Sequence, residues 1–245
     1  MIDPDLLLRA YAIGVFPMSD GRDAPEVYWV EPRRRAILPP DRFHLSRSLR
    51  KTLRSGRFTV TRDRAFAEVI RRCAQRGETW INRDIEDSYR ELHSRGSAHS
   101  IETWENGELV GGLYGVRLAG AFFGESMFST ATDASKVALA WLVARLKVGG
   151  FRLLDCQFMT GHLKSMGAVE ISQKAYLELL AAELDAAAAL LSRRGEALGR
   201  DAGAAGAAEF PDFGALELAL AASGVSAGSP GPAGCVISQL LVHTS

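Results

Sequence analysis

The chain has 245 residues, 47% of them hydrophobic, which is enough to bury one substantial core and leave residues for a small accessory domain or a tail. Its 29 basic and 29 acidic residues balance, so a polyanionic partner must be bound by a local cluster of cations and not by the overall charge. The three widely spaced cysteines fit neither a disulfide framework nor a zinc site. No basic segment precedes the first apolar stretch, as it would in a signal peptide, and no stretch reaches the roughly 18–20 apolar residues of a membrane span. A cytoplasmic protein without membrane contact is expected.

Hydrophobic periodicity and turn residues predict the elements of the first half in chain order. They are a helix at 3–13, strands at 28–30 and 36–38, a helix at 46–55, a strand at 57–61, and helices at 64–74 and 83–95. Asp63 and Asn82 stand before the last two helices. Short polar side chains accept hydrogen bonds from the first free amides of a helix, so both residues are expected to be caps.

The second half begins with the clearest hairpin signal in the chain. Strands at 99–105 and 108–118 flank Asn106 and Gly107, a pair that readily takes the positive φ angles of a type I′ turn. There follow a strand at 121–128, a helix at 134–148 capped by Asp133, a buried strand at 151–156, a short helix at 160–166, a short strand at 169–171 and a helix at 173–193. This order predicts an α+β (mixed α/β) fold around one sheet.

Three parts are expected along the chain: a small N-terminal lobe at 1–37, a main domain at 38–193, and an Ala/Gly-rich C-terminal tail at 194–245. Alanine and glycine dominate 199–208 and 226–234, which is typical of a loosely ordered tail. The stretch 236–242 is apolar enough to dock on the body as a strand or a short helix, and the sequence leaves open whether it does.

Seven short segments, taken together, resemble the leucyl/phenylalanyl-tRNA–protein transferase family. They are AIGVFP at 12–17, YW at 28–29, TWI at 79–81, HSIE at 99–102, GGLYGV at 111–116, GESMFS at 124–129 and LDCQ at 154–157. No single segment is specific, but their order and spacing across roughly residues 6–180 argue against chance agreement. The chain departs from the family in three places. It has Met18 where longer members carry tryptophan, its N-terminus is shorter, and its tail beyond about residue 190 has no known counterpart. One wall of the substrate pocket is therefore expected to differ.

The resemblance implies a GNAT-like acyltransferase domain behind a small N-terminal lobe. It implies an aminoacyltransferase that moves leucine or phenylalanine from aminoacyl-tRNA to the N-terminal Arg or Lys of acceptor proteins and so marks them for N-end-rule degradation. No cofactor and no metal are expected, and the family suggests a monomer.

Asp155 and Gln157 alternate along the buried strand, which places their side chains on one face and Cys156 on the other. The acceptor is an α-amine with a pKa of about 7.7–8.0, so part of it is neutral near pH 7 and the reaction needs orientation more than a strong base. By resemblance, the amide oxygen of Gln157 accepts a hydrogen from this amine, while Asp155 polarises Gln157. The alternative is that Asp155 only pairs or caps at a strand end.

Glu125 is an acid in a strand otherwise suited to burial. An unpaired buried carboxylate costs roughly several kcal/mol, so a cationic partner is expected. The partner could be the α-ammonium or the side chain of the acceptor's Arg or Lys, which would make Glu125 part of the catalytic site. It could also be one of the chain's own arginines, which would make Glu125 structural.

By resemblance, the leucyl or phenylalanyl side chain lies among five apolar residues: Leu113, Phe122, Met127, Leu142 and Leu154. Each of these could instead be ordinary core. Such a pocket separates side chains that differ by a methylene by only about 1–3 kcal/mol, so methionine would be accepted beside leucine and phenylalanine. Trp80 and Tyr89 are expected as aromatic platforms near the terminal adenosine, where stacking contributes roughly 1–3 kcal/mol. Core packing is again the alternative.

The stretch 42–57 carries six cations and no acid. Four of them recur at helical three- and four-residue spacing and would present a basic stripe to the tRNA acceptor stem without reading bases: Arg47, Arg50, Lys51 and Arg54. Solvated helix charges are the alternative. The zero net charge of the chain favours the tRNA interpretation, because the cations of this stretch have no acids beside them.

Two other functions are the alternatives, and the first of them shares the fold class. A GNAT-like N-acetyltransferase would bind acetyl-CoA at a glycine-rich turn before a helix, but the stretch 129–133 has no glycine and ends in an acid. A non-catalytic RNA-binding module would explain the basic stripe but would leave Asp155, Gln157 and Glu125 without a role. The histidines show no metal-ligand spacing and no Walker-type phosphate loop is present, so a metal site and nucleotide hydrolysis are disfavoured.

Overall fold

The centre of the molecule is a seven-stranded sheet in the spatial order β4, β5, β6, β7, β8, β3, β9. The computed structural model describes residues 1–197, 210–226, 228–229 and 231–242. Within them the strands of this sheet are β3 (Arg34–Ile37), β4 (Thr59–Arg62), β5 (Ala98–Glu105), β6 (Glu108–Leu118), β7 (Ala121–Ser129), β8 (Leu153–Gln157) and β9 (Val169–Ser172). Strands β7 and β8 run parallel and the other neighbours antiparallel, so the mixed α/β architecture predicted from the sequence is confirmed.

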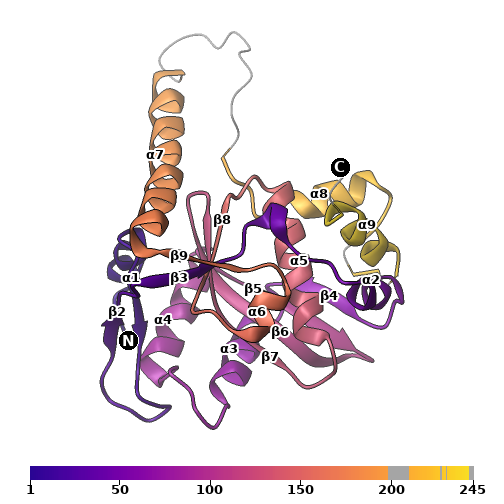
Figure 1. Cartoon of the computed structure of the whole chain (residues 1–245), viewed down its shortest axis with the longest axis horizontal. Coiled ribbons are helices and arrows are strands. Elements are labelled where there is room, and N and C mark those ends of the chain that lie inside the picture. Colours follow the sequence, from indigo (N-terminus) through magenta and orange to yellow (C-terminus); the bar gives the residue numbers. More distant parts are fainter. Residues whose placement is uncertain (198–209, 227, 230, 243–245) are drawn as a thin grey trace.

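Helices cover both faces of the sheet (Figure 1). On one face, one apolar core joins α2 (Arg47–Arg54), α5 (Ala134–Val148), α6 (Gly161–Ser165), α8 (Ala215–Ala222) and α9 (Pro232–Leu240). On the other face, a second core joins α1 (Pro4–Ala12), α3 (Phe66–Ala74), α4 (Arg83–Ser94) and the start of α7 (Gln173–Ala197). Successive residues of a strand point to opposite faces, which is why Phe122 belongs to the first core and Phe123 to the second.

Every helix and strand predicted from the sequence is present, with ends shifted by a few residues. The hairpin turn is confirmed, because Asn106 and Gly107 have φ angles of 53° and 82°. The cap of α4 is confirmed as well, since the side chain of Asn82 accepts from the amide of Ile85 at 2.9 Å. Three short elements were not predicted: β1 (Phe16–Met18), which pairs with β2 (Tyr28–Val30) in a separate ribbon, the 3-10 turn η1 (Pro40–Arg42), and α8.

The two predicted aspartate caps are wrong. Asp63 and Asp133 both adopt left-handed backbone, with φ angles of 57° and 68°, and neither side chain accepts from the amides of the following helix. Asp63 instead accepts from the amide of Ser100 at 2.9 Å, and Asp133 pairs with Lys136 at 2.8 Å. The carboxylate of Asp63 therefore binds a neighbouring strand and that of Asp133 binds a lysine side chain, and neither binds a free helix amide.

The predicted N-terminal lobe at 1–37 shares its last strand with the large sheet. Strand β3 lies between β8 and β9, so the predicted lobe contributes a strand to the large sheet, while the β1–β2 ribbon forms a separate sheet. Such pairing joins residues far apart in the sequence, and hydrophobic patterning carries no information about it.

The C-terminal part of the chain docks on the body. The apolar stretch predicted to dock forms the short helix α9, which packs against α2. The ring of Phe213 stacks on that of Phe122 with 5.3 Å between centroids, and the buried guanidinium of Arg145 pairs with Glu217. The loosely ordered stretch predicted at 199–208 lies outside the described residues. Among the described residues, no helix is long and apolar enough to cross a membrane.

Candidate active site

A cavity of about 370 Å³ opens between α5, the strands β6 to β8 and the segment 158–163. We call it the aminoacyl cavity. Four of the five apolar residues predicted around an aminoacyl side chain line it: Leu113, Met127, Leu142 and Leu154. The predicted aromatic platform Trp80 also lines it. Leu139, Phe158 and Leu163 complete the apolar wall and were not singled out in the sequence. The polar groups in this wall include Glu125 and Gln157.

Two of the residues predicted for this pocket are not among those that line the cavity. Phe122 does not line the cavity, because its ring is fully buried against Phe213. Tyr89 is also fully buried, and its hydroxyl donates to Glu125, so no face of its ring is open to a nucleobase. Met18, expected to alter one wall, is not among the lining residues either.

Glu125 reaches the cavity through a β-bulge. Tyr114 of β6 pairs with Ser126 and Gly115 pairs with Gly124, so Glu125 is the extra residue of β7 between them. A bulge of this kind redirects a side chain relative to the regular alternation of the strand. Glycine is required opposite the bulge, because a Cβ on Gly115 would lie 2.2 Å from the carbonyl oxygen of Phe123.

The carboxyl group of Glu125 is held by neutral donors. Tyr11 donates to Oε1 at 2.7 Å, Tyr89 donates to Oε2 at 2.8 Å, and Nε2 of Gln157 donates to Oε1 at 2.9 Å. Burial raises the pKa of Glu125 to about 7, against these three hydrogen bonds, which lower it. No arginine or lysine pairs with Glu125 among the described residues, so the structural ion pair considered from the sequence is not formed.

Gln157 stands at the end of β8 with a left-handed backbone, at a φ of 61°. Its side chain is fixed by the bond from Nε2 to Glu125. No donor contacts the amide oxygen in the part of the chain that the structure describes, which leaves this oxygen able to accept a hydrogen bond inside the cavity.

Asp155 lies behind the cavity and not in its wall. It is fully buried, on the face opposite Cys156, and accepts from Arg35 through Nε at 2.9 Å and from Tyr176 at 3.0 Å. Its Oδ1 also accepts from the main-chain amide of Gln157 at 2.8 Å. The two side chains thus share a face of the sheet, but Asp155 contacts the backbone of Gln157 and not its side-chain amide.

Arg35 is the buried cation of this site, and sequence reasoning missed it. Its guanidinium is 1% exposed, lies 4.7 Å from the ring centroid of Phe16 and 4.4 Å from that of Tyr176, and donates to the carbonyl of Gly14. A buried charge of this kind is stable only when fully paired and hydrogen-bonded. Hydrophobic patterning gave no signal for it, because Arg35 is the last of three consecutive arginines and stands before the predicted strand at 36–38.

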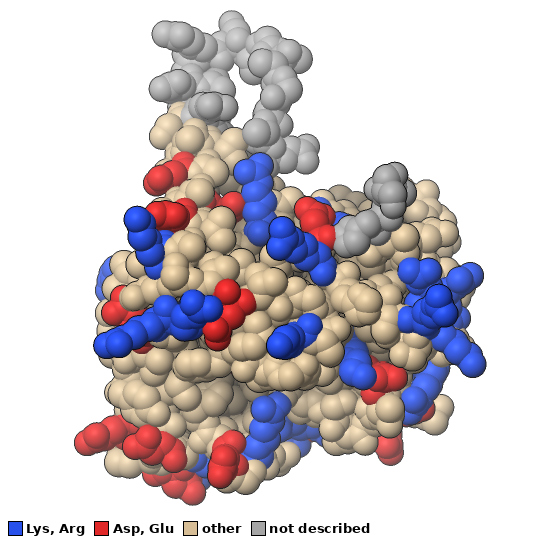
Figure 2. Space-filling view, viewed as in Figure 1, with Lys and Arg blue, Asp and Glu red and all other residues tan. Residues whose placement is uncertain are grey.

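The predicted basic stripe is exposed on α2. Arg47, Arg50, Lys51 and Arg54 are all exposed, and none has an ion-pair partner among the described residues. Figure 2 shows basic side chains gathered over the part of the molecule where Figure 1 places α2. Arg57 is the last of the six cations in the stretch 42–57. It forms an ion pair with Glu105 at 2.7 Å, so it adds no unpaired positive charge to the stripe.

Comparison with known proteins identifies the family. Residues 37–181 match the family model described as leucyl/phenylalanyl-tRNA protein transferase, and residues 1–33 match the model of its N-terminal domain. A leucyl/phenylalanyl-tRNA–protein transferase of Rhizorhabdus wittichii is 60% identical over 100% of this chain and 99% of that protein. One of Novosphingobium aromaticivorans is 55% identical over 100% of this chain and 97% of that protein. Both alignments include the C-terminal tail, so the expectation that the tail has no counterpart is wrong.

Among solved structures, that of FemX aligns with a TM-score of 0.47 at 13% identity, covering 69% of this chain and 66% of that chain. A likeness at this level does not establish the fold. The two family models and the full-length relatives are sufficient without it: the chain belongs to the leucyl/phenylalanyl-tRNA–protein transferase family.

Proposed function

We propose that the chain transfers leucine or phenylalanine from aminoacyl-tRNA to the N-terminal Arg or Lys of acceptor proteins, and so marks them for N-end-rule degradation. As a member of its family it is an aminoacyltransferase. The observation that carries the proposal is an apolar cavity in whose wall a carboxyl group holds an amide in place, through Glu125 and Gln157. An apolar pocket discriminates leucine, phenylalanine and methionine by only about 1–3 kcal/mol, so methionine is a third donor side chain.

In the proposed reaction the α-amine of the acceptor attacks the ester carbonyl of aminoacyl-tRNA. A C–N bond forms, the ester C–O bond breaks, and the ribose oxygen leaves with a proton. The amide oxygen of Gln157 accepts a hydrogen from the amine and aligns it with the carbonyl. Glu125, with a pKa of about 7, takes up the proton that the amine loses and can return it to the leaving oxygen. Asp155 contributes indirectly, by fixing the backbone of Gln157.

The acceptor's positive charge also fits this site. Because Glu125 is held by tyrosine hydroxyls and an amide, no cation of the protein neutralises its ionised form among the described residues. A bound α-ammonium, or the side chain of an N-terminal Arg or Lys, would stabilise that form. This complementarity supports a basic acceptor over an acidic one.

We assign the exposed stripe of α2 to the phosphate backbone of the tRNA and Trp80 to its terminal adenosine. We assign the large sheet to the GNAT-like acyltransferase type, on the basis of the helix α5 that connects the parallel strands β7 and β8. We propose a monomer as the working unit, as the family resemblance suggests. We place the activity in the cytoplasm, where aminoacyl-tRNA is available.

The experiment incubates the protein with labelled leucyl-tRNA and a peptide that begins with Arg, and measures label on the peptide. Transfer is expected, and Gln157→Ala and Asp155→Ala are expected to be nearly inactive while still binding tRNA. Arg50→Ala combined with Lys51→Ala should instead weaken tRNA binding and make its salt dependence shallower, because fewer counterions are released. If the two kinds of variant behave alike, the division between reacting and tRNA-binding residues is wrong. Binding without transfer would indicate an RNA-binding module, and acetylation of the peptide from acetyl-CoA would indicate an N-acetyltransferase.

A further inference from the structure

A second cavity, of about 530 Å³, opens directly beside the aminoacyl cavity. We call it the side cavity. The two cavities share Arg76, Met127 and His162 as walls, so a ligand bound in one can extend into the other. The remaining walls of the side cavity come from α3, the end of β7 and the start of α5, and the reaction proposed above uses none of them.

The side cavity has a positive wall and no negative one. None of its nine lining residues carries a carboxylate, and two are arginines, Arg72 and Arg76. Arg76 is exposed and has no ion-pair partner among the described residues. Arg72 shares the carboxylate of Glu68 with Arg71, so that one carboxylate serves two guanidinium groups. A concave surface with uncompensated cations attracts an anion.

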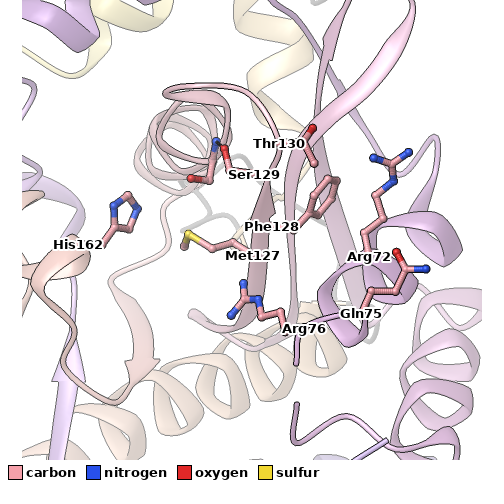
Figure 3. Close-up of a pocket in the computed structure, with 9 residues that line it drawn as sticks. Arg72, Gln75, Arg76, Met127, Phe128, Ser129, Thr130 and His162 are labelled. Carbon is pink, nitrogen blue, oxygen red and sulfur yellow. Dashed lines mark hydrogen bonds between the residues drawn. The ribbon is translucent and has the colours of Figure 1, made fainter. Parts of the chain in front are cut away.

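Neutral groups of the side cavity can also bind an anion. In the described part of the chain, no hydrogen-bond partner contacts the hydroxyl of Ser135, at the start of α5, or the side-chain amide of Gln75. His162 keeps a buried Nε2 without a partner, again among the described residues, and burial together with Lys136 lowers its pKa. Figure 3 shows Arg76 extending beneath Met127 toward the His162 side, while Arg72 and Gln75 stand on the opposite side of the cavity.

We infer that the side cavity binds a phosphodiester of the tRNA 3′ strand, with Arg76 as its principal contact. The inference rests on the proposed function. With the aminoacyl group in the aminoacyl cavity, the tRNA strand can continue past the wall that the two cavities share, and this brings the phosphate of the terminal nucleotide to the side cavity. A guanidinium matches a phosphate with two parallel hydrogen bonds. The basic N-terminus of the acceptor is repelled by the same wall and must approach from elsewhere.

The test measures binding and not turnover. Two nonhydrolysable analogues are compared, an amide-linked leucyl aminoadenosine and the same molecule extended by a 5′ cytidylyl phosphate. Wild-type protein is expected to bind the phosphate-bearing analogue about tenfold or more tightly, as a charge-assisted hydrogen bond implies. Arg76→Ala should bring this ratio close to one, and Arg76→Lys should restore part of it, because lysine keeps the charge and loses the paired geometry.

Two controls make the result specific. Arg90→Ala removes an exposed arginine of α4 that also lacks an ion-pair partner among the described residues, and it should leave the ratio unchanged. Arg50→Ala with Lys51→Ala should weaken binding of whole tRNA but leave the ratio unchanged, because the short analogues do not extend to α2. If the ratio of the two affinities is unchanged in Arg76→Ala, the inference is overturned. It is also overturned if Arg76→Ala binds both analogues as wild type does but has a higher KM for the acceptor peptide. Failure of the proposed function would look different, since wild-type protein would then transfer no label from leucyl-tRNA.

Discussion

The hydroxyl of Tyr89, which donates to Glu125, gives a direct way to shift the pKa of that carboxyl group. Tyr89→Phe removes the donor to Oε2 of Glu125, which has no other donor among the described residues, and changes the volume of the fully buried side chain very little. Tyr11 and Gln157 still donate to Oε1. The lost bond favours the ionised form, so its removal raises the pKa of Glu125 further.

The size of this shift follows from the hydrogen bond. A hydrogen bond to a charged group contributes about 1.5–3 kcal/mol, and one pKa unit corresponds to about 1.36 kcal/mol, so the pKa should rise by about 1–2 units from its value of about 7. The ionised fraction at pH 7 then falls from about one half to about a tenth or a hundredth. If the ionised carboxylate accepts the proton of the amine, kcat/KM at pH 7 falls about five- to fifty-fold and recovers at higher pH.

The assay is the pH profile of kcat/KM for transfer from leucyl-tRNA to a peptide that begins with Arg. Tyr114→Phe is the matched control, because the hydroxyl of Tyr114 is buried near the same site but has no hydrogen-bond partner in the described part of the chain. The acidic limb should move upward in Tyr89→Phe and stay in place in Tyr114→Phe. An unmoved limb, or an equal shift in both variants, refutes the role assigned to Glu125.

Three further predictions concern stability. The pKa of Glu125 is about 7 in the folded protein and its ordinary value is 4.5, so wild-type protein loses up to about 3 kcal/mol of unfolding free energy as pH rises between these values. In Glu125→Gln the unfolding free energy should depend less on pH, which urea denaturation at about pH 5 and about pH 8 measures. Arg35→Ala leaves Asp155 buried and unpaired and should cost about 3–5 kcal/mol, whereas Arg34→Ala breaks only an exposed pair and should cost less than about 1 kcal/mol. Phe213→Ala should lower the unfolding free energy by about 3–5 kcal/mol, measured by denaturant titration, and an unchanged value would mean that the C-terminal part is not coupled to the core.

Local patterns were enough to predict most helices and strands of this fold, but not the short elements β1, η1 and α8. The helices and strands were predictable because their apolar residues repeat at helical or strand spacing, and the Asn106–Gly107 turn because few pairs adopt two positive φ angles so readily. The alternation along β8 also placed Asp155 and Gln157 on one face. What could not be predicted was how residues far apart in the chain meet, such as Tyr11 with Glu125, or Arg35 with Asp155.

The same limit explains why two residues predicted for the pocket do not line the cavity. Phe122 and Tyr89 are apolar or aromatic residues in the expected elements, and whether such a residue lines a cavity or fills the core depends on what packs against it. Phe213, about ninety positions further along the chain, covers Phe122, and Glu125 engages the hydroxyl of Tyr89. Glu125 could be singled out because an acid in a buried strand contradicts its surroundings. Arg35 gave no such signal, because it follows two other arginines and stands before the predicted strand at 36–38.

The left-handed backbone of Gln157 sets two demands on one position. A residue with a side chain is strained at a φ of 61°, and the side-chain amide of Gln157 donates to Glu125 from this position. Alanine would remove the amide and keep the strain, whereas glycine would remove both. A glycine variant is therefore expected to relieve the backbone strain and, under the proposed function, to lose transfer activity, which would mean that the fold holds strain at the residue proposed to align the amine.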